Sequence, residues 1–231
     1  MSGDDDFPRM SSGIPRLDEM IEGGFPCPSV ILLAGAAGTG KSTFCLQFLT
    51  QGAKNSESSL FFTTLSEPTQ WMLRFASRYT FINKDFFGKE IKFVELGRYI
   101  QDSSNMSELL DYIEENITEV MPSRIVIDPV TIIKDMIPTD KYRGFLYNLT
   151  THLKNWQATT ILTGEILPNE LYPVEISYIA DGVILLTYKE SSDGPTSKYL
   201  EILKMRGTNH MTGKNLVNIS WDGMDISPGL R

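Results

Sequence analysis

Short apolar runs alternate with amphipathic segments through the first two thirds of the chain. The runs are rich in residues that favour strands, and the segments between them place apolar residues at helical spacing. This alternation predicts a parallel sheet with helices on both faces. The predicted strands are Val30–Ala34, Leu60–Leu65, Ile91–Leu96, Arg124–Asp128 and Thr159–Thr163, and the helices are Phe44–Leu49, one opened by Pro68, Met106–Glu119 and Phe145–Trp156.

The last third of the chain is rich in strands and hairpin-like. Gly182–Tyr188, Tyr199–Met205 and Leu216–Ser220 predict antiparallel strands at one side of the sheet. Residues 131–142 predict an irregular connection. We expect residues 1–11 to be a flexible acidic arm and residues 12–231 to form a single α/β domain.

Composition narrows the classes of function. The 231 residues carry a net charge of −8, which disfavours broad nucleic-acid binding through neutralised phosphates. Cys27 and Cys45 are the two cysteines, so a disulfide framework is not expected and a reducing compartment fits. The N-terminus is acidic where a secretory signal would be basic, and apolar runs are too short to span a bilayer. We therefore expect a cytoplasmic protein away from membranes.

A glycine-rich segment between the first predicted strand and its helix matches G-x-x-x-x-G-K-[ST] at every fixed position. The glycines let backbone N–H groups approach phosphate oxygens, and the following helix adds its positive end. The lysine is expected to reach the β- and γ-phosphates, and the serine to hold Mg²⁺. The predicted phosphate-binding residues are Gly35, Ala36, Ala37, Gly38, Thr39, Gly40, Lys41, Ser42 and Thr43.

Three acidic residues follow predicted strands whose carboxyl ends should share one edge of the sheet. Asp128 is either an ordinary strand-ending acid in a turn or, as its pairing with the glycine-rich loop favours, a group that holds Mg²⁺ opposite Ser42. Glu67 either activates the attacking water or is a helix-start acid stabilised by the helix dipole. Glu165 either senses the γ-phosphate or satisfies a turn.

Lys204 and Arg206 are two residues apart at the end of a predicted strand, so both side chains point the same way. Neighbouring cations favour an anion between them. Either they form a solvated basic edge, or they contact a phosphate bound by an adjacent subunit, where such a cation contributes roughly a thousandfold or more in rate.

Together these residues resemble the KaiC branch of the RecA-like ATPases, over residues 12–228. Besides the phosphate loop, the resemblance rests on the entry segment 12–26, on residues 181–184, and on Lys204-Met205-Arg206-Gly207-Thr208-Asn209-His210, which resembles a K-x-R-G-x-x-H signature. It implies a RecA-like fold, ATP or ADP with Mg²⁺ as ligands, and a homo-hexameric ring with ATP between subunits. By the same resemblance Lys204 and Arg206 reach the next subunit's γ-phosphate.

The chain departs from that family's pattern at two places. The family usually has two consecutive glutamates after the second strand, where this chain has Ser66-Glu67, so the resemblance implies weaker water activation and slow hydrolysis. Residues 175–181 resemble the segment that carries the phosphoacceptor residues in the second domain of this family's circadian clock protein. Ser177 matches its serine and is the candidate phosphoacceptor, while Tyr178 replaces its threonine.

The leading hypothesis is a slow, ring-forming ATPase that regulates an unidentified protein partner through its nucleotide state. One alternative is a DNA-recombination ATPase resembling RadA. That class needs basic loops, whereas residues 131–143 carry Lys134, Lys141 and Arg143 beside Asp135 and Asp140. The other alternative is an ATP-dependent scaffold without significant turnover, which the serine at position 66 favours.

Overall fold

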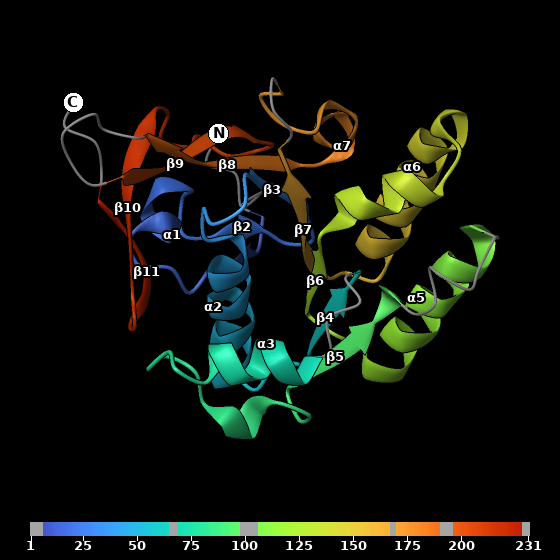
Figure 1. The fold of residues 1–231 in the computed structure, drawn as a ribbon, viewed down its shortest axis with the longest axis horizontal. Coiled ribbons are helices and arrows are strands. Elements are labelled where there is room, and N and C mark those ends of the chain that lie inside the picture. The colour runs from blue at the N-terminus through green and yellow to red at the C-terminus, as the bar shows by residue number, and fades with distance from the viewer. Residues whose placement is uncertain (1–6, 65–68, 98–105, 167–169, 190–195, 228–231) are drawn as a thin grey trace, which may run out of the picture.

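The computed structural model describes residues 7–64, 69–97, 106–166, 170–189 and 196–227. Its main sheet has nine strands in the order β11-β10-β9-β8-β3-β7-β6-β4-β5 (Figure 1). The six strands from β8 to β5 run parallel, and β9, β10 and β11 are antiparallel to their neighbours. The strands are β3 (Val30–Gly35), β4 (Ser59–Thr63), β5 (Ile91–Glu95), β6 (Arg124–Asp128), β7 (Thr159–Glu165), β8 (Gly182–Lys189), β9 (Ser197–Met205), β10 (Lys214–Ser220) and β11 (Gly223–Ser227).

Helices cover both faces of the parallel part of the sheet. Figure 1 shows α2 on one side of the strands and α5 and α6 on the other. The helical elements are α1 (Leu17–Met20), α2 (Lys41–Lys54), α3 (Thr69–Ala76), α5 (Met106–Val120), α6 (Thr139–Asn155), α7 (Val174–Ile179) and the 3-10 turns η1 (Lys84–Phe86) and η2 (Val130–Met136). The sequence-based expectation of a mostly parallel sheet with antiparallel strands near the C-terminus is confirmed.

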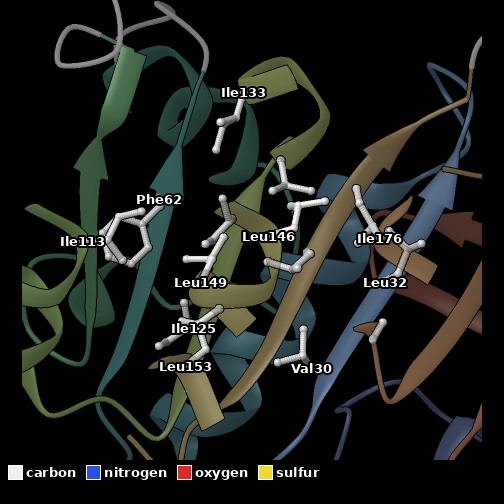
Figure 2. Close-up of a cluster of buried hydrophobic side chains, with 14 of the residues drawn as sticks. Val30, Leu32, Phe62, Ile113, Ile125, Ile133, Leu146, Leu149, Leu153 and Ile176 are labelled. Atoms are coloured by element: carbon white, nitrogen blue, oxygen red, sulfur yellow. The ribbon is translucent and has the colours of Figure 1, made fainter. Parts of the chain in front are cut away.

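Strand β3 shows how alternation divides the core into two. Val30 and Leu32 contribute to a cluster with residues of α5 and α6, whereas Ile31 and Leu33 contribute to a cluster with residues of α1 and α2. Figure 2 shows the first cluster, in which side chains of α6 lie over the strands. Full burial of such a side chain stabilises the fold by about 1.5–3 kcal/mol. A buried strand between two helical layers must therefore be apolar on both faces.

The connection after β6 and the last strand differ from their sequence-based description. The connection after β6 is more regular than expected, because η2 covers Val130–Met136 and α6 begins at Thr139, ahead of Phe145. Strand β11 was not predicted; it pairs with β10 through a turn closed by Ser220 and Gly223. Its five residues are too few for a clear period-two pattern, and only pairing with β10 makes them a strand.

The N-terminal segment is partly tied to the domain. Strand β1 (Arg9–Met10) pairs with β2 (Phe25–Pro26) in a separate two-stranded sheet. The Arg9 guanidinium also donates a 2.7 Å hydrogen bond to Thr208 Oγ1. Over residues 7–11 the structure therefore differs from a loose arm, because a long-range pairing holds the segment. Residues 1–6 lie outside the described part, and the division into arm and domain stays a prediction.

Candidate functional site

The glycine-rich loop connects the end of β3 to the start of α2. Gly38 and Gly40 have φ angles of +78° and +110°, which side chains with a Cβ rarely adopt. A Cβ on Gly35 would lie 2.6 Å from Thr39 Oγ1. The loop therefore needs glycine for its path and its tightness. It leads into a 14-residue helix whose first N–H groups form a natural anion site.

Lys41 lies inside this loop, with 7% of its side chain exposed. Its ammonium group donates to the Gly35 carbonyl at 2.7 Å and to the Ala36 carbonyl at 3.1 Å. A carboxylate oxygen of Glu165 lies 2.9 Å from the same nitrogen. An ammonium has three N–H donors, so these partners occupy all three in the described structure. Glu165 thus lies at the phosphate loop rather than serving only its own turn.

Asp128 meets Ser42 across the loop. The Ser42 hydroxyl donates to Asp128 Oδ2 at 3.3 Å, and the Thr163 hydroxyl donates to Asp128 Oδ1. Burial raises the pKa of Asp128, and the hydrogen bond from Thr163 is the main opposing influence, followed by the positive charge of Lys41. The structure therefore places a half-buried carboxylate directly beside the helix-start serine.

Parallel pairing explains why these groups converge. In the register of the sheet Gly35 of β3 is opposite Glu165 of β7. On its other side β7 pairs with β6, which ends at Asp128. The carboxyl ends of parallel strands share one edge of the sheet, where ligands bind in open α/β folds. The loop and both acids were expected at this edge from the sequence, and the structure brings them together.

A cavity of about 470 Å³ lies over the loop. Its lining includes Lys198 of β9, whose ammonium donates a 2.7 Å hydrogen bond to the Gly38 carbonyl. It also includes Tyr79, whose hydroxyl lies 3.1 Å from Thr43 Oγ1. Neither residue was predicted from the sequence. Neither belongs to a motif, and Lys198 is 160 residues from Gly38 in the sequence, so only the antiparallel extension of the sheet brings it to the loop.

Lys204 and Arg206 lie away from their own chain's loop. Gly35 is opposite Leu186 of β8, whereas Lys204 is opposite Val183, several residues nearer the other end of that strand. Lys204 donates to the carbonyl oxygens of Ser177 and Ala180 at 3.1 and 2.6 Å, and burial lowers its pKa.

Arg206 donates to Asp181 Oδ1 at 3.2 Å, and 54% of its side chain is exposed. Within one chain the two cations therefore bind the end of α7 and the two residues after it. The structure does not bring them to Lys41.

The remaining candidates have separate locations. Glu67, and Ser66 before it, lie outside the described residues. Ser177 is in α7, and its hydroxyl donates to the Val174 carbonyl at 2.7 Å. His210 Nδ1 lies 3.4 Å from the Thr208 carbonyl oxygen, in the turn after β9.

A glycine loop between a strand and a helix, a buried lysine, and a serine facing an aspartate are the parts of a P-loop NTPase site. The family model for the KaiC ATPase matches residues 10–231. The chain belongs to this family, within the RecA-like P-loop ATPases.

Individual relatives agree with this assignment. The circadian clock oscillator protein KaiC 1 of Synechocystis is 32% identical over 228 residues, which cover 96% of this chain and 43% of that protein. The KaiC of Synechococcus elongatus is 30% identical over 233 residues, with the same coverage of each chain. The crystal structure of a KaiC-like protein from Pyrococcus horikoshii has a TM-score of 0.84 and 33% identity, and the match covers 96% of this chain and 100% of that one.

The chain spans less than half the length of the curated relatives it matches. Within the part of the chain that the structure describes, helices fall short of the length and apolar character needed to cross a membrane.

Proposed function

We propose that the chain binds Mg²⁺·ATP at the glycine loop and hydrolyses it slowly as a ring-forming, regulatory cytoplasmic ATPase. The observation that carries the proposal is the 3.3 Å approach of Ser42 Oγ to Asp128 Oδ2, directly beside the buried Lys41. The proposed Mg²⁺ ligands, the glycine loop and the start of α2 line one cavity, which supports the proposal.

The donor set fits Mg²⁺. This cation prefers a few protein oxygens completed by water and phosphate oxygens. Ser42 and Asp128 supply a hydroxyl and a carboxylate, and among the described residues there is no cluster of three or more acidic, histidine or cysteine side chains that would form an all-protein cage. Burial raises the pKa of Asp128, so a cation beside this carboxylate would stabilise its charged form. When bound, Mg²⁺ would neutralise charge on the terminal phosphates.

The residues of the chain supply the rest of the proposed chemistry. The loop backbone and the start of α2 cradle the phosphates, and Lys41 exchanges its present partners for phosphate oxygens. Lys198 stabilises the middle of the loop by donating a hydrogen bond to the Gly38 carbonyl. Glu67 is the proposed group that orients and deprotonates the attacking water, and the lone glutamate at this position favours slow turnover.

The proposed ring follows from the separation of the two cationic groups. Lys204 and Arg206 lie several residues along the sheet from their own loop, so a phosphate that they contact belongs to another copy. Arg206 is the better placed of the two, because more than half of its side chain is exposed. A hexamer with ATP between neighbours is the arrangement we propose, with an unidentified protein as the downstream partner.

Autophosphorylation of Ser177 is a separate part of the proposal. Ser177 shares α7 with the carbonyl groups that Lys204 and Arg206 bind, so a phosphate there would change the anchoring of both cations. Intact-mass measurement after incubation with Mg²⁺·ATP tests this directly. A Ser177→Ala variant is the control, and an unchanged wild-type mass refutes it.

DNA recombination is less well supported. Lys134, one of the cations in the connection after β6, forms a 3.0 Å ion pair with Glu175 of α7. A cation that is already paired contributes less to binding a phosphate backbone. Titration with single-stranded DNA at moderate salt, together with turnover measured with and without DNA, discriminates the two functions.

Nucleotide binding, phosphate release and native mass measured on the same preparations test the main proposal. We expect wild type to bind ATP, release phosphate slowly and assemble further with ATP. Lys41→Ala should lose all three properties, whereas Lys92→Ala, which removes an exposed ion pair with Glu119, should keep them. A strict monomer with and without ATP excludes the ring, and equal background rates in wild type and Glu67→Gln favour the scaffold.

A further inference from the structure

Glu165 forms part of the wall between two cavities. One is the cavity over the glycine loop. The other, of about 270 Å³, is lined by residues of η2, α6 and α7 and of the segment before α7, among them Lys134 and Glu175. The Glu165 side chain is 40% exposed, and one of its oxygens lies 2.9 Å from the Lys41 ammonium. A single carboxylate thus contacts the cation of the phosphate site and also borders a neighbouring space.

The partners of Lys41 differ in how easily a ligand can displace them. The Gly35 and Ala36 carbonyls are parts of the loop backbone, which the pairing of β3 and the glycine conformations hold in place. Glu165 contributes a side chain with rotatable bonds at the end of β7. An incoming phosphate carries the same charge sign as this carboxylate and competes with it for the same ammonium.

We propose that Glu165 is an internal competitor of phosphate at Lys41, an autoinhibitory contact that the nucleotide must displace to bind. This inference rests on the proposed function of the loop as a nucleotide site.

The second cavity offers room for a displaced side chain. A carboxylate released from Lys41 can turn toward this space, which is lined by Lys134 and by the acids Asp135, Glu170 and Glu175. The Lys134–Glu175 ion pair joins η2 to α7 there. Glu175 and Ile176 of α7 line the same space, and α7 carries carbonyl groups that accept hydrogen bonds from Lys204 and Arg206.

Removing the charge of Glu165 should strengthen anion binding. The ion pair joins a buried cation to a partly exposed carboxylate, so we expect Glu165→Gln to bind ADP and inorganic pyrophosphate about three- to tenfold more tightly than wild type. Glu165→Ala, which removes the same charge and more volume, should change affinity in the same direction. Asp111→Asn removes an exposed acid on α5 that lines neither cavity, and should leave both affinities unchanged.

The test is isothermal titration of the full chain with ADP and with pyrophosphate, in EDTA so that divalent cations do not contribute. Circular dichroism of each variant confirms folding before titration. Equal or weaker affinity in both Glu165 variants, with normal binding by wild type, overturns the competitor role and leaves the proposed function intact. An equal gain in Asp111→Asn also overturns it, because the lower net negative charge of the chain would then explain the effect. Absence of wild-type binding to ADP and to Mg²⁺·ATP would overturn the proposed function and this inference together.

Discussion

Replacing Asp128 with asparagine should make the nucleotide-free chain more stable while weakening its response to Mg²⁺ and nucleotide. The raised pKa of Asp128 means that the fold disfavours its charged form, chiefly through burial. Each unit by which a pKa is raised costs about 1.4 kcal/mol of stability where the group is ionised in both states. For a domain of this size, each kcal/mol changes Tm by roughly 2–4 °C. Asparagine has a similar shape and carries no charge, so its side chain avoids this cost.

The raised pKa of Asp128 also fixes the direction in which the free energy of unfolding changes with pH. Below the unfolded pKa of about 3.9 both states of the Asp128 carboxyl are protonated, and the group contributes no penalty. As the pH rises toward the higher folded pKa, the folded state retains its proton longer than the unfolded state, so the free energy of unfolding falls. Above the folded pKa the penalty is constant. The stability advantage of Asp128→Asn should therefore grow over this window and then level off.

Thermal unfolding followed by circular dichroism between pH 4 and pH 8 measures the effect, with Asp111→Asn, an exposed acid on α5, as control. Repeating the thermal unfolding with Mg²⁺·ADP tests the predicted weaker response to Mg²⁺ and nucleotide. A ligand at one hundred times its Kd stabilises wild type by about 2.7 kcal/mol, and most of this gain should be absent in Asp128→Asn. A nucleotide-free Asp128→Asn chain less stable than wild type at pH 7 would refute the account of the buried charge.

Two further predictions concern contacts that the sequence did not reveal. Lys198→Ala should weaken nucleotide binding severalfold, because the Gly38 carbonyl loses its 2.7 Å partner, while Lys92→Ala leaves it unchanged in the same titration; equal affinities would refute the role of Lys198. Glu57→Gln should lower the free energy of unfolding by about 1–3 kcal/mol in denaturant titration, because Arg124, only 1% exposed, loses the charge of a carboxylate 2.5 Å away. Unchanged stability there would show that the carbonyl groups around Arg124 suffice.

The strand pattern and the glycine motif were predictable because both depend on residues close together in the chain. The alternation of apolar residues in β3 reflects burial on two faces, and the loop needs glycine at Gly38 and Gly40 for local conformational reasons. The position of Asp128 also followed from local pattern, since the acid directly ends a buried strand. The short strand β11 and the beginning of α6 were missed or misplaced, because pairing and packing decide them.

The sequence by itself determined the family, the loop, and the lysine, serine and aspartate at one edge of a parallel sheet. The tertiary structure decided which other side chains share that edge. Lys198 reaches Gly38 because β9 extends the sheet antiparallel to β8, and Glu165 reaches Lys41 because β7 lies beside β3. It also placed Lys204 and Arg206 away from their own loop. Strand order and register connect residues far apart in the chain, and no local pattern records which strands become neighbours.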